Sequence, residues 1–143
     1  MSAPIDWERV SDETQAKIAQ IRLKAVGALK RSKYSAKKTI VNGVRFDSLK
    51  EARRSQELDL LVAAGEIVNL QRQVPYTLQC AFRHRGKHYR DIRYIADFVY
   101  REKGNPAPVV EDVKSPATRK NQVYRLKVKL LLAKYPEIEF RET

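Results

Sequence analysis

Three strand-like segments separated by short turns lie between residues 76 and 114, and they restrict the chain to folds built on a sheet. The segments comprise residues 76–82, 88–100 and 109–114, with the turn-forming Gly86 and Gly104 between them. Connections this short favour neighbouring strands that run as a meander.

Helical patterns flank the three strands. One helix begins at Asp47-Ser48 and ends at Gly65, a residue type common just after a helix C-terminus. Pro136 ends a second helix and is followed by more extended structure over residues 137–140. The predicted order is αβββαβ, an α/β fold with a central mixed sheet.

The second helix spans about residues 121–135, and its spacing predicts which side faces the core. An apolar stripe is formed by Val123, Leu126, Leu130 and Ala133. We expect this stripe to pack on the sheet.

The N-terminal part is predicted to hold a helix and a small hairpin. Ser11 is expected to cap a helix that runs to about Leu29, and a basic linker follows over residues 30–38. Asn42-Gly43 then predicts a two-residue hairpin turn.

Two parts follow from this organisation: a helix with its linker over residues 1–38, and a domain over residues 39–143. Nine basic residues and no acid lie between Glu13 and Asp47. Such a segment is either a solvated extension or a contributor to binding of DNA phosphates.

The charge balance indicates a polyanionic partner. The 143 residues include 29 Lys and Arg against 17 Asp and Glu, a formal net charge of +12, so nucleic acid is the first candidate. No apolar run approaches the ~18 residues of a membrane span, and the first residues lack a signal-peptide pattern. A cytoplasmic protein that does not bind membranes is therefore expected.

Zinc coordination is the alternative that the histidines raise. Cys80 is the only cysteine, which excludes an intrachain disulfide. A zinc site would need Cys80, His84 and His88 together with a carboxylate such as Asp91. Because Cys80 alternates with apolar residues, the pattern favours a buried thiol and two solvated histidines instead.

An acid interrupts the apolar run over residues 94–100. Asp97 is unusual there, because aspartate is depleted in strands and a charge among apolar residues requires a partner or a cation. The alternative is an edge strand on which Asp97 faces water.

The next strand brings an acid and a lysine to one face, since alternation places Val110, Asp112 and Lys114 together. A simple ion pair at a strand end would account for Asp112 and Lys114 alone. Beside Asp97, however, Asp112 would form a pair of carboxylates that repel each other unless a divalent cation bridges them.

Glu51 is a third acid in an apolar setting. Helical spacing places it near Ser55, Leu58 and Val62, and so directs it toward the sheet. Ser48 lies three residues before Glu51, so a capping box is the alternative role, and the two roles are compatible.

Together these residues provide the functional groups that metal-dependent phosphodiester hydrolysis requires. Glu51, Asp97 and Asp112 provide oxygen ligands suited to Mg²⁺ or Mn²⁺. Lys114 would orient or help to deprotonate the attacking water and neutralise developing negative charge.

This arrangement resembles the PD-(D/E)XK nuclease superfamily. The segments that carry the resemblance are residues 46–52, 94–98, 110–114 and 135–142. Within the superfamily the chain looks like a phage and prophage group of small nuclease-like proteins, with more distant likeness to archaeal Holliday-junction resolvases and transposon endonuclease subunits. Ala96 stands where the superfamily signature often has proline.

The resemblance implies a restriction-endonuclease-like core and a role for each residue. Asp97 and Asp112 would bind the metal ion, Glu51 would complete or water-bridge its shell, and Lys114 would be the catalytic lysine. Glu111 makes the register ambiguous by one, and the spacing to Lys114 favours Asp112 as the ligand.

A basic surface is predicted around the last helix, because that helix and the segment before it contain seven bases and no acid. Arg119 and Lys120 precede the helix, while Lys127 lies between its apolar stripes and faces either the site or the solvent. Arg85 and Lys87 at a hairpin tip are further candidates for phosphate contacts, which favour recognition of shape over sequence.

The sequence therefore predicts a Mg²⁺-dependent endonuclease acting on DNA, with Mn²⁺ as an alternative ion. The resemblance further implies a preference for Holliday junctions or other branched DNA in phage recombination or DNA processing, inside a bacterial host. Two symmetric cuts would require a homodimer. Alternatives are a non-catalytic DNA-binding accessory protein and a site-specific or nicking endonuclease subunit of a recombination complex, and RNA stays open as the substrate.

Overall fold

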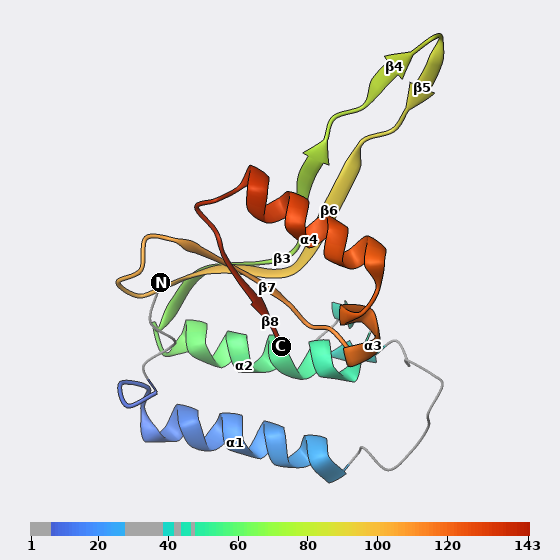
Figure 1. Ribbon diagram of the computed structural model, residues 1–143. Helices are drawn as coiled ribbons and strands as arrows, with labels where there is room; N and C mark the ends of the chain where they lie inside the picture. The colour runs from blue at the N-terminus through green and yellow to red at the C-terminus, as the bar shows by residue number, and fades with distance from the viewer. Residues whose placement is uncertain (1–6, 28–38, 42–43, 47) are drawn as a thin grey trace. The chain divides into compact units, whose positions relative to one another are not determined.

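The structure, a computed structural model, describes residues 7–27, 39–41, 44–46 and 48–143 (Figure 1). The chain divides into two compact units. One comprises Met1–Leu70 with Glu102–Gly104, and the other comprises Gln71–Arg101 with Asn105–Thr143. The predicted basic linker and the Asn42-Gly43 turn lie outside the described residues, and the domain boundary at residue 38 stays a prediction.

The first unit contains two helices. α1 (Asp12–Gly27) follows Ser11, whose hydroxyl accepts a hydrogen bond from a backbone amide of the first turn at 3.4 Å. α2 (Leu49–Ala63) begins after the N-cap Ser48 and ends just before Gly65, which has a φ of +75°. The start of α1 and both ends of α2 agree with the predictions, while the predicted end of α1 at about Leu29 lies outside the described residues.

An ion-pair network joins α1 to α2. Glu57 of α2 is buried and accepts hydrogen bonds from Arg22 of α1 at 3.2 and 3.3 Å, and from Arg54 at 2.9 Å. The Arg22 guanidinium also lies 5.5 Å from the centroid of the Trp7 ring. With Ile18 buried as well, α1 packs as part of this unit.

The small hairpin predicted before α2 is present. β1 (Thr39–Val41) and β2 (Val44–Phe46) pair antiparallel, with Thr39 opposite Phe46. Phe46 is buried, which ties the hairpin to the core of the first unit.

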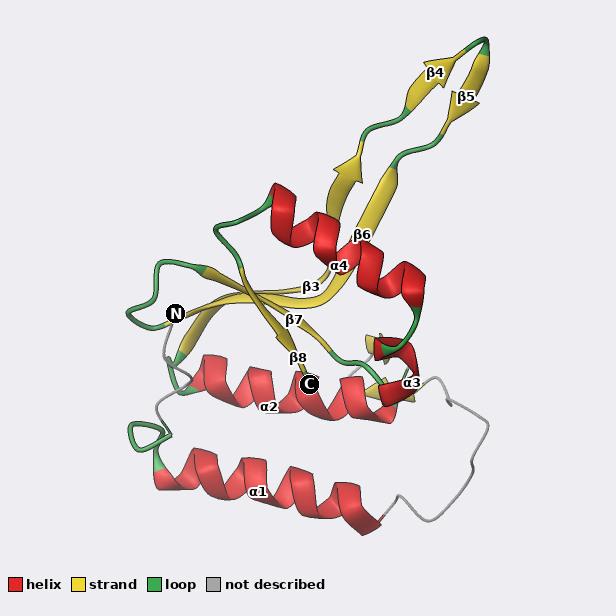
Figure 2. Cartoon of the chain, in the orientation of Figure 1, coloured by secondary structure: helices red, strands yellow, loops and turns green. Residues whose placement is uncertain are grey.

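A mixed four-stranded sheet has the strand order β3-β6-β7-β8 (Figure 2). Its strands are β3 (Ile67–Gln79), β6 (Ile92–Glu102), β7 (Pro108–Asp112) and β8 (Glu139–Glu142). β6 and β7 are antiparallel, whereas β7 and β8 are parallel because a helical connection joins them. The α/β class and the mixed sheet are confirmed.

Two helices lie between β7 and β8. α3 (Pro116–Arg119) is a single turn capped by Ser115, which the sequence analysis did not anticipate, and α4 (Gln122–Lys134) follows with Asn121 as its N-cap. Among the described residues, no helix combines the length and the apolar character needed to cross a membrane.

β3 begins at Ile67 rather than at Tyr76 as predicted. Asn69 and Gln73 have φ values of 56° and 53°, in the left-handed region that strand residues rarely adopt. Such residues interrupt the alternation of side chains, so the first half of this strand lacks the pattern by which strands are recognised.

α4 packs through a different stripe from the one predicted. Val128 and Leu131 belong to the core formed with β6 and β7, whereas Val123, Leu126 and Leu130 are 40% to 63% exposed. The prediction was wrong because apolar residues occupy more than one face of this helix, and only tertiary packing selects between them.

A separate two-stranded ribbon extends the hairpin between β3 and β6 away from the sheet (Figures 1 and 2). It consists of β4 (Phe82–His84) and β5 (Lys87–Tyr89). Cys80 at its base is exposed, so the predicted buried thiol is wrong. The sheet has already ended at Gln79, and the ribbon has no core to cover the thiol.

Candidate active site

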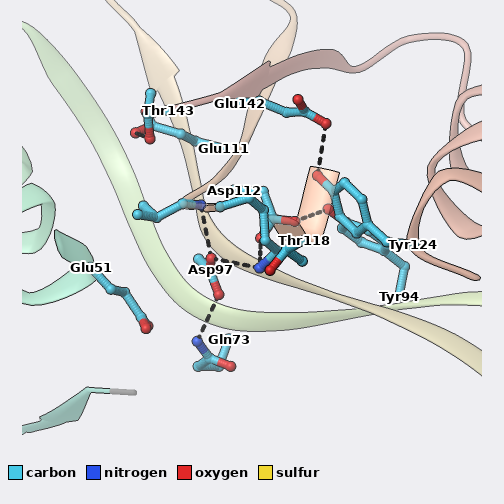
Figure 3. Close-up of polar contacts among 12 residues, drawn as sticks. Glu51, Gln73, Tyr94, Asp97, Glu111, Asp112, Thr118, Tyr124, Glu142 and Thr143 are labelled. Carbon is cyan, nitrogen blue, oxygen red and sulfur yellow. Dashed lines mark hydrogen bonds and ion pairs between the residues drawn. The ribbon is translucent and has the colours of Figure 1, made fainter. Parts of the chain in front are cut away.

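Two buried aspartates lie on the neighbouring central strands β6 and β7 (Figure 3). The antiparallel ladder ends with Phe98 opposite Glu111, so Asp97 and Asp112 follow at the next position on each strand. Asp97 is 8% exposed and Asp112 is fully buried. Because β6 lies between β3 and β7, the alternative that placed Asp97 on an edge strand facing water is wrong.

The ammonium group of Lys114 contacts both carboxylates. Its Nζ lies 3.2 Å from Oδ2 of Asp97 and 2.9 Å from Oδ1 of Asp112. Burial lowers the pKa of Lys114, but its contacts with Asp112 and Asp97 and the negative charges of these acids outweigh burial and raise this pKa above its ordinary value. Lys114 is therefore a cation held by two acids.

Asp97 has two further donors. The backbone amide of Val113 donates to Oδ2 at 2.9 Å, and the side-chain amide of Gln73 donates to Oδ1 at 3.2 Å. Burial and the neighbouring Asp112 raise the pKa of Asp97 from 3.8 to about 7, although Val113 and Lys114 act in the opposite direction. The carboxyl group of Asp97 thus titrates near neutral pH.

Gln73 reaches Asp97 from β3, where its backbone is left-handed. This conformation interrupts the alternation of side chains along β3 at the position from which the amide contacts Asp97. Gln73 is not predictable as a site residue, because a glutamine in a strand carries no signal of an unusual backbone angle. The only available hint was a run of polar residues before Val74-Pro75-Tyr76.

Asp112 is oriented by a tyrosine. The hydroxyl of Tyr94 donates a hydrogen bond to Oδ2 of Asp112. Burial and this contact raise the pKa of Tyr94, so its proton stays in place. The other oxygen, Oδ1, accepts no hydrogen bond within the described part of the chain, and the Lys114 ammonium approaches it only as an ion pair.

The N-terminal part of α4 adds an aromatic neighbour. The Tyr124 ring lies 6.4 Å from the Tyr94 ring, and its hydroxyl donates to Oε1 of Glu142 at 2.9 Å. Burial and Glu142 raise the pKa of Tyr124. The Lys114 ammonium lies 5.9 Å from the Tyr124 ring centroid, which adds a cation–π contact.

Glu111 faces away from this cluster. Its carboxylate accepts hydrogen bonds from Tyr100 at 2.7 Å and from Thr143 at 3.2 Å. Of the two adjacent acids, it is therefore Asp112 that the structure brings together with Asp97 and Lys114, as the spacing to the lysine indicated.

Glu51 lies in the other unit, near the start of α2. It is 7% exposed, and its backbone amide donates to the Ser48 hydroxyl at 3.1 Å, which is one half of the capping box. Leu58 is buried on the predicted face, but Val62 is 41% exposed, so that face is narrower than predicted. The role of Glu51 in a metal shell stays a prediction.

The basic residues proposed to contact DNA lie at several places in the second unit. Arg119 forms an ion pair with Glu142 at 3.5 Å, and Lys120 is exposed directly after α3. Lys127 is half-buried on α4. Arg85 and Lys87 are exposed at the tip of the β4–β5 ribbon.

The residues of the cluster suit a divalent cation in their chemistry. No group of three or more His, Cys, Asp and Glu placed to hold a metal is found among the residues that the structure describes. Asp97 and Asp112 nevertheless offer carboxylate oxygens, which hard cations prefer, and Oδ1 of Asp112 is buried without a hydrogen bond. Lys114 supplies positive charge at the same place.

The fold and the cluster define an α/β protein with a buried acid pair on the two central strands of its sheet. A family model described as "Protein of unknown function (DUF1064)" matches residues 31–142, and the chain belongs to this family. The match includes every residue of the cluster. No curated protein and no solved structure matches the chain.

Proposed function

We propose that this protein is a metal-dependent DNA endonuclease with a restriction-endonuclease-like core. The observation that carries the proposal is the cluster that the buried Asp97 and Asp112 on β6 and β7 form with Lys114, which follows β7. The net charge of +12 supports a polyanionic substrate. The preference for branched DNA rests on the resemblance alone.

The acids of the cluster are costly to the fold, which supports a functional role. Asp97 and Asp112 are both buried, and burial raises the pKa of Asp97 to about 7. Buried acids with strongly raised pKa values are concentrated at functional sites.

Each residue has a role in the proposed reaction. Asp97 and Asp112 would hold Mg²⁺ or Mn²⁺, and Glu51 would complete the ligand set. When bound, the cation would neutralise charge on the scissile phosphate and lower the pKa of the attacking water. Lys114 neutralises negative charge that develops on the phosphate, and Tyr94 keeps the Asp112 carboxylate in one orientation.

Cleavage of labelled DNA tests the proposal. Four-way junction, splayed, duplex and single-stranded DNA are incubated with Mg²⁺, Mn²⁺ or EDTA. We expect metal-dependent cleavage that Asp97→Asn and Lys114→Ala both abolish. Asp91, which is partly buried in an ion pair with Arg93, and the exposed Lys103 provide matched controls. Asp91→Asn and Lys103→Ala should leave cleavage unchanged.

The pattern of substrates distinguishes the kinds of nuclease. Preference for the four-way junction indicates a resolvase, while single nicks in duplex DNA indicate a nicking enzyme. Failure to cut any of these DNAs with any metal ion, in a folded preparation that binds them, contradicts the proposal.

A non-catalytic DNA-binding protein is the second candidate. It is favoured by the internal contacts of the acids, because Lys114, Tyr94 and Gln73 already engage them. Under this alternative, DNA binding persists without cleavage and is unaffected by Asp97→Asn.

A further inference from the structure

The β4–β5 ribbon has no part in the acid cluster, yet it is built with a distinct charge pattern. All six residues of its two strands are exposed. Residues 80–90 contain four Lys and Arg, two His and no acid. A basic projection of this kind is not needed to complete the sheet or its core.

The ribbon nevertheless has a defined shape. Phe82 and Tyr89 lie opposite each other with their rings stacked, 4.8 Å apart at 4°. Arg85 and Gly86 form the turn with φ values of 47° and 78°, as a two-residue hairpin turn requires. An isolated two-stranded hairpin is marginal in water, and the stacked pair contributes to the stability of this one.

Its basic residues lie on both faces. His84 pairs with Lys87 on the face of the stacked rings, and Arg83 pairs with His88 on the other face. Within the ribbon, no acid lies opposite any of these basic residues. This pattern suits a polyanion that contacts both faces of the ribbon.

We propose that the β4–β5 ribbon inserts into the major groove of duplex DNA. The major groove is ~12 Å wide and admits a two-stranded ribbon, whereas the minor groove at ~6 Å is too narrow. Three residues per strand span ~10 Å, which is close to the ~8.5 Å depth of the major groove. Both faces would then meet phosphate-lined walls, with Arg85 and Lys87 deepest in the groove.

This inference rests on the proposed function for its choice of DNA as the ligand, but its test needs no cleavage. Binding of a fluorescent 30-base-pair duplex is measured by anisotropy in EDTA over a range of salt concentrations. We expect Arg85→Gln/Lys87→Gln to weaken binding about tenfold and to reduce the slope of log affinity against log salt by ~1–2.

A matched variant controls for loss of charge. Arg101→Gln/Lys103→Gln also removes one arginine and one lysine two residues apart, and both side chains are exposed. We expect it to change the affinity less than twofold. Equal losses in the two double variants would overturn the proposal, because they would show a general effect of net charge.

Double-stranded RNA of the same sequence tests the groove itself. Its major groove is deep and too narrow for side chains to read, so a ribbon cannot enter. We expect the ribbon variant to lose affinity for DNA but not for this RNA. Equal losses of affinity for both duplexes would overturn groove insertion, whatever the cleavage assay shows. If the ribbon binds DNA as expected but the protein cuts none, only the proposed nuclease activity is contradicted.

Discussion

The hydroxyl of Tyr94 donates to the buried carboxylate of Asp112, and the same two strands repeat this relationship with Tyr100 and Glu111. Both tyrosines belong to β6 and both acids to β7. Only the first pair adjoins Lys114. Variants of the two tyrosines therefore distinguish effects on the acid cluster from effects on the stability of the sheet.

Replacing either tyrosine by phenylalanine should destabilise the protein to a similar extent. Tyr94→Phe and Tyr100→Phe each remove a donor from a buried acid, so we expect the free energy of unfolding in urea to fall by ~1–3 kcal/mol. Only Tyr94→Phe should also lower cleavage, by ~10–100-fold, with a higher requirement for Mg²⁺. Similar losses of cleavage in both variants would contradict the assignment of Asp112 to the site.

Gln73→Ala should lower cleavage about tenfold and leave DNA affinity unchanged, because Asp97 loses the donor that fixes one of its oxygens. Alanine also has a β-carbon, so the left-handed backbone is no better accommodated than before. Gln71→Ala, an exposed position on the same strand, is the control. Kinetics with both variants would refute a positioning role for Gln73 if their rates were equal.

The free energy of unfolding in EDTA should fall as the pH rises from 5.5 to 8. The pKa of Asp97 is about 7 in the folded state and 3.8 in the absence of the fold. Between these two pH values the folded state binds a proton that the unfolded state has released. Stability that is present at low pH is lost as the pH rises through 7, by about 2 kcal/mol. Urea titrations check this expectation.

Asp97→Asn should flatten this dependence on pH, because the amide does not titrate. Saturating Mg²⁺ should flatten it as well in the wild-type protein, since a cation favours the ionised carboxylate. A slope unchanged by Asp97→Asn would assign the effect to another group.

Glu57→Gln should loosen α1 from α2, because Arg22 and Arg54 lose their common anionic partner. We expect the free energy of unfolding to fall by ~1–3 kcal/mol and hydrogen exchange in α1 to accelerate. Glu13→Gln breaks only the exposed pair with Lys17 and should leave the free energy of unfolding close to that of the wild-type protein. Unchanged exchange in α1 after Glu57→Gln would show that its apolar contacts suffice.

The order of the helices and strands is predictable because its signals are local. Ser48 and Gly65 mark the ends of α2, and Pro136 ends α4. The proximity of Asp97, Asp112 and Lys114 follows from alternation on adjacent strands, and the structure brings these three together.

Features that depend on tertiary structure could not be predicted in this way. Leu131 rather than Leu130 is buried on α4, since the choice between two apolar faces is made by the sheet beneath. Gln73 joins Asp97 through a backbone conformation that its residue type does not suggest. The exposure of Cys80 likewise depends on where the sheet ends.

Strand β8 is synthesised last among the elements described here, and it pairs with the strand that carries Asp112. The amide of Thr143 donates to the carbonyl of Asp112 at 3.0 Å, and the amide of Lys114 donates to the carbonyl of Thr143 at 3.1 Å. A nascent chain synthesised only through α4 contains both acids and the lysine but lacks the strand that pairs with the backbone of Asp112 and Lys114. The backbone at Asp112 and Lys114 is thus paired with β8 only after translation has passed Thr143, so a site that acts as proposed would be completed after that point.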